Sequence, residues 1–130
     1  MIVTLSVPQL VALHGELLNA FGGRRGLRDR SALESAAARP GMTFDGEDLS
    51  PDLAAKAAAL MHSLVVNHAF VDGNKRVGAA AAELVVEVNG YRLRAADSDL
   101  EDLTLAVARG ELSAEAIAIW FRQRLEPAET

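Results

Sequence analysis

The feature that most constrains this chain is its division into short apolar segments by residues that start and stop helices. Two alanine-rich segments show the clearest periodicity, because their apolar residues fall at offsets that share one face of a helix. These residues are Leu53, Ala57, Leu60 and Leu64 in the first segment and Val77, Ala81, Leu84 and Val88 in the second. The spacing predicts two amphipathic helices, which are also the most apolar and therefore central.

The boundaries of four helices follow from their flanking residues. A first helix is predicted from about Val7 to Phe21, with Gly22 and Gly23 as its stop, and a second from near Asp29 or Ser31 to just before Pro40. Between it and the third helix, residues 41–49 indicate a loop with a turn at Asp45-Gly46. For the third helix, Ser50 is the expected N-cap and Pro51 the first residue. The fourth is expected from about Asn74 to Asn89, with Gly90 as its left-handed stop.

The C-terminal third predicts a short strand and two further helices. Tyr91 to Arg94 alternates as a strand does, and Ser98 with Glu101 forms a capping-box pattern for a fifth helix that closes at Gly110. Ser113 is the expected cap of a sixth helix, and residues after Leu125 are expected to be a frayed tail. The apolar residues that the sixth helix turns toward the core are Ile117, Trp120 and Phe121. The prediction is an all-α bundle of about six helices in one domain, residues 1–130, with room for a short hairpin or flap.

Composition excludes several classes of protein. The chain has no cysteine, and thirteen basic against eighteen acidic residues give a net charge of −5. Disulfide frameworks and thiolate chemistry are therefore excluded, and a general nucleic-acid or membrane binder is disfavoured. Charges interrupt every apolar stretch well before the roughly 18 residues that a membrane span needs, and the N-terminus lacks the pattern of a secretory signal. We expect a cytoplasmic protein without a membrane or nucleic-acid partner.

The residues that could take part in catalysis lie in the segment between the third and fourth helices. Its sequence is His68-Ala69-Phe70-Val71-Asp72-Gly73-Asn74-Lys75-Arg76. The first N–H groups of the fourth helix have no partner within it and lie at the positive end of its dipole. Lys75 and Arg76 add two cations, and Gly73 lets a bound group approach the backbone, so the segment predicts a phosphate site. Asp72 is a suitable oxygen ligand for Mg²⁺ shared with a polyphosphate, and His68 could accept a proton from a hydroxyl. Together these groups indicate phosphoryl or nucleotidyl transfer.

Each group also has an ordinary structural interpretation. A histidine near a helix end is often a cap or core residue, Asp72-Gly73 alone indicates a turn, and Lys75-Arg76 alone fits a solvated helix face. Their convergence in one loop favours the functional interpretation. The chain has no G-x-x-x-x-G-K-[ST] loop, so a P-loop nucleotide site is excluded.

This segment resembles the signature of the Fic/Doc superfamily, H-P-F-x-[DE]-G-N-G-R-x-x-R. The chain has Ala69 in place of the proline, Lys75 in place of the second glycine and Ala79 in place of the last arginine. The lysine is the hallmark of the Doc (death-on-curing) branch. The similarity extends from about Val7 to Leu125 and includes the segments Gly26-Leu27-Arg28-Asp29 and Asn89-Gly90-Tyr91.

The resemblance implies a helical toxin of a type II toxin–antitoxin module that transfers the γ-phosphate of ATP to a threonine of elongation factor Tu and stops translation. In that interpretation His68 is the general base and Asp72 binds Mg²⁺. The residues that would hold the nucleotide phosphates are Gly73, Asn74, Lys75 and Arg76. A cognate antitoxin, whose C-terminal segment folds on binding, is the expected partner.

Two alternatives remain open. Fic relatives with the full motif transfer AMP to a protein hydroxyl, and a non-catalytic module would only bind an antitoxin. Lys75 and Ala79 favour kinase activity over AMP transfer, since both change the anion site.

Three further features have a weaker signal. The arginines 24, 25, 28 and 30 indicate either a solvated turn or a docking surface for an acidic partner. Residues 42–49 correspond to the position of the target-positioning flap of Fic proteins. His14 and His62 are interpreted as structural, since neither has a partner at metal-ligand spacing.

Overall fold

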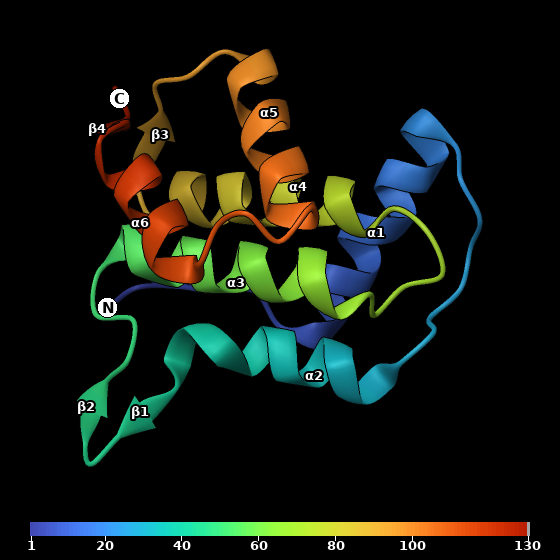
Figure 1. The fold of residues 1–130 in the computed structure, drawn as a ribbon, viewed down its shortest axis with the longest axis horizontal. Coiled ribbons are helices and arrows are strands. Elements are labelled where there is room, and N and C mark those ends of the chain that lie inside the picture. The colour runs from blue at the N-terminus through green and yellow to red at the C-terminus, as the bar shows by residue number, and fades with distance from the viewer. Residues whose placement is uncertain (130) are drawn as a thin grey trace.

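The computed structural model describes residues 1–129, and its centre is the antiparallel pair α3 (Leu53–Asn67) and α4 (Asn74–Val88) (Figure 1). Eleven of the fifteen residues of α3 are buried, and most are alanine, leucine or valine. Small side chains allow the two helices to approach closely. A Cβ added at Gly78 of α4 would lie 2.5 Å from the Val65 side chain of α3. The predicted central position of these two helices is confirmed.

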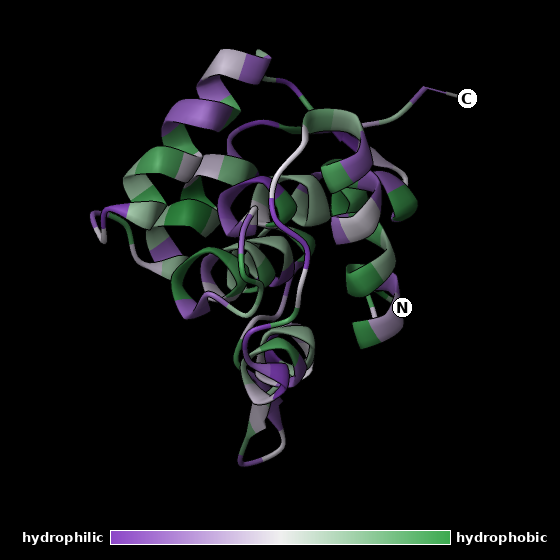
Figure 2. Cartoon of the chain, turned by 90° about the vertical axis from the view of Figure 1, so that its right-hand side faces the viewer, coloured by the Kyte–Doolittle hydropathy of each residue, from purple (hydrophilic) through white to green (hydrophobic). Residues whose placement is uncertain are grey.

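Four other helices surround this pair. They are α1 (Val7–Phe21), α2 (Arg30–Ala38), α5 (Asp97–Ala108) and α6 (Ala114–Arg122), with a 3₁₀ turn η1 at Arg39–Gly41. Hydrophobic and hydrophilic residues alternate along the helices in Figure 2, as expected where one face of each packs on the core. The prediction of a six-helix, mostly α fold is confirmed.

Several predicted helix ends coincide with observed caps. Asp29 accepts a hydrogen bond from Ala32 N–H at the start of α2, and Ser113 does the same for Ala116 N–H at the start of α6. At the start of α1, Ser6 and Gln9 form a capping box that the sequence analysis missed. Ile117 and Phe121 are fully buried, whereas Trp120 is only partly buried.

Two predicted caps were wrong. The N-cap of α3 is Asp52 rather than Ser50, because the Asp52 carboxylate accepts from Ala55 N–H and also pairs with Arg122 of α6. Ser50 and Pro51 therefore precede the helix. At α5 the helix begins at Asp97, and the Asp99 carboxylate accepts from the Ala96 N–H. Ser98 consequently lies inside the helix rather than at its cap.

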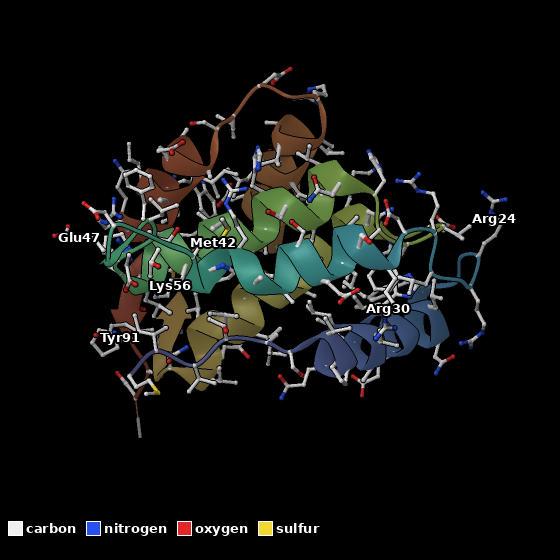
Figure 3. All side chains as sticks on the ribbon, turned by 90° about the horizontal axis from the view of Figure 1, so that it is seen from below. Arg24, Arg30, Met42, Glu47, Lys56 and Tyr91 are labelled. Atoms are coloured by element: carbon white, nitrogen blue, oxygen red, sulfur yellow. The ribbon has the colours of Figure 1, made fainter. Side chains whose placement is uncertain are left out.

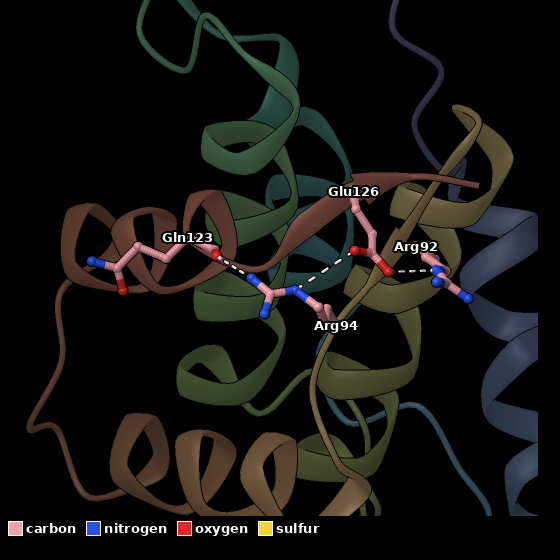
Figure 4. Close-up of polar contacts among 4 residues, drawn as sticks. All are labelled: Arg92, Arg94, Gln123 and Glu126. Atoms are coloured by element: carbon pink, nitrogen blue, oxygen red, sulfur yellow. Dashed lines mark hydrogen bonds and ion pairs between the residues drawn. The ribbon is translucent and has the colours of Figure 1, made fainter. Parts of the chain in front are cut away.

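Two small antiparallel sheets complete the fold. β1 (Thr43–Phe44) and β2 (Glu47–Asp48) form a hairpin about the predicted Asp45-Gly46 turn, where both residues have positive φ. β3 (Tyr91–Leu93) pairs with β4 (Leu125–Pro127), with Arg92 opposite Glu126. The prediction of a frayed tail after Leu125 was therefore wrong as far as Pro127. The Glu126 carboxylate contacts the guanidinium groups of Arg92 at 2.7 Å and Arg94 at 3.6 Å (Figure 4).

Among residues 1–129, no helix combines the length and the apolar character that crossing a membrane would require.

Candidate functional site

A cavity of about 670 Å³ opens beside the N-terminus of α4. Residues 72–76 form one side of it, and side chains of α1, α4 and α5 form the rest. These side chains include Leu17, Phe21, Ala79, Ala80, Glu83, Leu100, Thr104 and Leu105. The structure thus brings five of the six predicted site residues to one cavity wall, from Asp72 to Arg76.

The N-terminus of α4 supplies main-chain donors to this wall. Gly73 is the N-cap and adopts a left-handed conformation with φ of 81°. Glycine has no side-chain acceptor, so the N–H groups of Asn74, Lys75 and Arg76 are not capped by it, and none has a partner within the helix. Three free donors at the positive end of a helix dipole form an anion site.

Two cationic side chains flank these donors. Lys75 and Arg76 are exposed and line the cavity, and the Arg76 guanidinium lies 4.4 Å from the centre of the Phe21 ring. Within residues 1–129 neither side chain makes a salt bridge, so their charge is available to a ligand. The cavity is also lined by Glu83, further along α4, and by Asp97 and Glu101 of α5. A polyanion is therefore favoured only at the α4 end.

Asn74 contributes differently from the prediction. Its side chain is buried, its Oδ1 accepts from Phe70 N–H at 3.0 Å, and its Nδ2 donates to Phe70 C=O at 2.9 Å. The amide therefore closes the loop onto the start of α4 and is not free for a phosphate. Only the main-chain N–H of Asn74 is available to bind a phosphate.

Asp72 is exposed and held by two main-chain donors. Its Oδ2 accepts from Arg24 N–H at 3.0 Å and its Oδ1 from Gly73 N–H at 2.9 Å. These two hydrogen bonds, that from Arg24 first, lower the pKa of the Asp72 carboxyl below its ordinary value, so the group is ionised at neutral pH.

The residues of the site could bind Mg²⁺ only together with the phosphates of a bound nucleotide. Within residues 1–129, no group of three or more His, Asp or Glu side chains could hold a metal. A single ionised carboxylate with spare lone pairs, beside a phosphate site, matches the way Mg²⁺ is bound through one carboxylate, waters and substrate phosphates. Asp72 is the residue that would hold it.

His68 terminates α3 in a left-handed conformation, with φ of 51° and ψ of 52°, and it is exposed. Its carbonyl accepts from Arg28 Nε at 2.7 Å, and the Asn67 carbonyl accepts from the same guanidinium at 3.2 Å. The His68 side chain is not part of the cavity wall. The imidazole is therefore accessible from solvent, outside the cavity, in the loop that carries the anion site.

The segment between α1 and α2 holds this loop, which the sequence analysis did not foresee. The Ala69 carbonyl accepts from the N–H groups of Arg28 and Asp29, and the Gly26 carbonyl accepts from Val71 N–H. Leu27 and Phe70 form a β-bridge. The three glycines of the segment were a usable signal, since Gly23 and Gly26 have positive φ and lie against Asp72 and Val71, where a Cβ would crowd.

The arginine cluster thus has a role that neither interpretation included. Arg28 binds carbonyls at the end of α3, Arg25 donates to Asn19, and Arg30 lies 3.7 Å from Glu34. The cluster is in part a scaffold for the loop.

The 42–49 hairpin lies far from the loop. It leads into the N-terminus of α3, and Asp48 lies 3.6 Å from Lys56 in the first turn of that helix, whereas His68 follows the last turn. A fifteen-residue helix is about 22 Å long. Figure 3 shows Met42, Glu47 and Lys56 at one end of the molecule and Arg24 at the other. The hairpin therefore does not lie beside His68, as a target-positioning flap would.

The fold and the site together define a mostly α-helical bundle with an anion site at the N-terminus of α4 and an exposed histidine in the loop that precedes this helix. The chain belongs to the Fic/DOC family, since residues 4–86 match the sequence profile of that family. It is 48% identical over 102 residues to "Toxin Doc" of Mycolicibacterium smegmatis, which covers 76% of this chain and 78% of that protein. It is 31% identical over 126 residues to "Protein kinase doc" of Escherichia phage P1, which covers 96% of this chain and 98% of that protein.

Proposed function

We propose that this chain is a Doc-type toxin that transfers the γ-phosphate of ATP to a threonine hydroxyl of elongation factor Tu. The observation that carries the proposal is the presence, in one loop and the helix start that follows it, of the first amides of α4, two cations without a salt bridge among residues 1–129, and a solvent-accessible histidine. The relative named a protein kinase supports phosphate transfer, and the relative named a toxin supports the biological role.

In the proposed reaction, the residues at the cavity wall bind ATP and His68, outside the cavity, acts on the threonine. The amides of Asn74–Arg76 and the side chains of Lys75 and Arg76 bind the phosphates at the cavity wall. His68, on the solvent side, accepts the proton of the threonine hydroxyl as its oxygen bonds to the γ-phosphorus. The bond from that phosphorus to the β–γ bridging oxygen breaks, and ADP leaves. Mg²⁺ held by Asp72 would neutralise charge on the polyphosphate.

Two positions favour phosphate transfer over AMP transfer. Lys75 places a cation where the Fic motif has glycine, and it lines the cavity. Ala79 also lines the cavity, so the site has a methyl group where the motif has its last arginine. Moving positive charge within the anion site changes which phosphate is held against the acceptor.

The test is to incubate the protein with elongation factor Tu, Mg²⁺ and γ-labelled ATP. We expect labelled factor with the wild type and none with His68→Ala. Intact mass decides between the activities, since a phosphate adds about 80 Da and an AMP about 329 Da to the target. An unlabelled factor with folded, antitoxin-free protein would overturn the proposal, and equal rates for His68→Ala would remove the proposed base. A chain that folds but binds no ATP would favour the non-catalytic module.

A cognate antitoxin completes the proposal. The side chains of Phe21 and Leu105 line the cavity and remain 64% and 37% exposed. A disordered antitoxin segment that folds as an amphipathic helix would bury them at the cavity mouth. Bound there, it would compete with ATP, and addition of the antitoxin segment should raise the apparent KM for ATP.

A further inference from the structure

His14 of α1 lies directly beneath the loop that carries the anion site. The ring is 5% exposed and stacks on Phe70 with 3.8 Å between centroids and 10° between planes. Its Nε2 lies 2.7 Å from the carbonyl oxygen of Asp72. A carbonyl oxygen only accepts hydrogen bonds, so Nε2 must carry the hydrogen.

This one hydrogen bond fixes a whole peptide plane. The Asp72–Gly73 peptide is planar, so its C=O and N–H point in opposite directions. With the C=O directed at His14, the Gly73 N–H is directed away from it and donates to Asp72 Oδ1 at 2.9 Å. The orientation of the carboxylate is therefore coupled to His14 through this peptide.

The peptide needs such a restraint because Gly73 is conformationally permissive. Glycine populates positive and negative φ about equally, so the peptide before it can flip at little cost. A flip would place the carbonyl oxygen against the Asp72 carboxylate, where two acceptors repel. The carboxylate would then leave its position beside the first turn of α4.

The ring is well placed to prevent the flip. Phe70, on which it stacks, is 2% exposed, and its N–H and C=O are both held by the Asn74 amide. A Cβ at Gly73 would lie 3.5 Å from His14 Nε2, so ring and peptide are in close contact. The imidazole ring of His14 is therefore held by its contacts with both Phe70 and the Asp72–Gly73 peptide.

We propose that His14 is a positioning residue: its Nε2–H holds the Asp72–Gly73 peptide so that the Asp72 carboxylate faces the nucleotide phosphates. The activity part of this inference rests on the proposed function, whereas the orientation of the peptide does not. The burial and stacking of His14 agree with the structural interpretation made from the sequence, and the proposal adds a positioning role to it.

Three substitutions separate the hydrogen bond from packing. His14→Phe keeps an aromatic ring for stacking on Phe70 and removes the donor. His14→Gln places an amide nitrogen near the position of Nε2 and removes the ring, and His14→Asn offers the same amide on a shorter side chain that cannot reach. Ile117→Val in α6 is the control for lost stability, since it is fully buried in the core and far from the loop in sequence.

Binding of ATP with Mg²⁺, measured by calorimetry, should weaken by about 10- to 100-fold in His14→Phe and His14→Asn, the usual effect of losing a group that orients a ligand. His14→Gln should stay within about threefold of the wild type. A purely structural role predicts affinity that follows the melting temperature, so that Ile117→Val would weaken binding too. Wild-type affinity in His14→Phe, or equal losses in Gln and Asn, would overturn the proposal.

NMR tests the peptide without reference to activity. In the wild type, a long-range ¹H–¹⁵N spectrum should show hydrogen on Nε2 of His14, and the Gly73 amide signal should shift in His14→Asn and return in His14→Gln. Absence of hydrogen on Nε2 would overturn the proposal. If the wild type binds no ATP, the proposed function fails, and these spectra still decide the role of His14.

Discussion

Arg28 Nε donates to the main-chain carbonyl of His68 at 2.7 Å, which ties the proposed base to a loop forty residues earlier in the chain. The same guanidinium donates to the Asn67 carbonyl at 3.2 Å. These carbonyls belong to the last turn of α3, where the helix leaves them without intrahelical partners. His68 adopts a left-handed conformation, which is costly for a residue with a Cβ, so external bonds of this kind are needed to hold it.

Replacing Arg28 by glutamine should therefore reduce catalysis more than nucleotide binding. His68 lies outside the cavity, so its displacement should lower kcat by up to about 100-fold while KM for ATP changes little. Initial rates of labelled-phosphate transfer measure both. Arg30→Gln is the matched control, because Arg30 belongs to the same cluster and, among residues 1–129, its guanidinium has one polar partner, Glu34 at 3.7 Å. Equal rates for the two variants would contradict the assigned role.

Asn74→Ala should destabilise the protein even though its residue lies in the proposed phosphate site. The substitution removes both bonds to Phe70 and leaves a buried N–H and C=O unsatisfied, at about 1–3 kcal/mol for each group. Urea unfolding should show a loss of about 2–4 kcal/mol. Asn19→Ala, which removes only an exposed acceptor of Arg25, should cost less than about 0.5 kcal/mol. A wild-type midpoint for Asn74→Ala would return Asn74 to the role of a free phosphate ligand.

The helices were predictable because local signals determine them. Ser113, Asp29 and Gly90 act on residues within one turn of themselves, and the apolar spacing of α3 and α4 is itself a helical period. The five residues from Asp72 to Arg76 are equally local, so their convergence on one cavity wall could be predicted. The predicted caps Ser50 and Ser98 were wrong because the carboxylates of Asp52 and Asp99, two residues and one residue away, accept the hydrogen bonds at these helix starts.

The remaining features depend on partners distant in sequence. β4 is held by β3, more than thirty residues earlier, and an isolated Leu-Glu-Pro segment carries no sign of it. His14 meets Asp72 across 58 positions, and Arg28 meets His68 across 40. Such pairs arise from the packing of α1 and α2 on the central helices. The periodicity of a sequence predicts which face of a helix is buried, but it does not predict which residues that face will contact.

Gly78→Ala should destabilise the central helix pair. The added Cβ would lie 2.5 Å from Val65 Cγ2 and 3.4 Å from the Met61 carbonyl, so one of the helices must shift. Overpacking of this kind costs about 1–3 kcal/mol, which outweighs the gain in helix propensity. The control is Gly15→Ala in α1, where no other atom lies within 4 Å of the new Cβ and a gain of about 0.5–1 kcal/mol is expected. Thermal unfolding should move the two midpoints in opposite directions, and a shared direction would refute the close approach of α3 and α4.

Asp52→Asn should lower stability at neutral pH and have no effect in acid. The side chain of Asp52 accepts two bonds from Arg122 at 2.8 and 3.0 Å, and this pair is the main reason that the pKa of Asp52 lies below its ordinary value. A carboxyl whose pKa is lower in the folded state stabilises it above the unfolded pKa, and the contribution disappears as pH falls through the folded value. Asparagine keeps the cap on Ala55 N–H but loses the charge.

Because Asp52 and Arg122 are both about half exposed, the difference in stability between wild type and Asp52→Asn at pH 7 should be only about 0.2–1 kcal/mol, and salt should reduce it. Urea unfolding of both proteins from pH 7 to well below the ordinary pKa of an aspartate, about 3.9, should show the gap closing as Asp52 is protonated. A gap that persists in acid would mean that the difference does not come from the Asp52 charge, and the absence of a gap at pH 7 would mean that Asp52 acts through its cap alone.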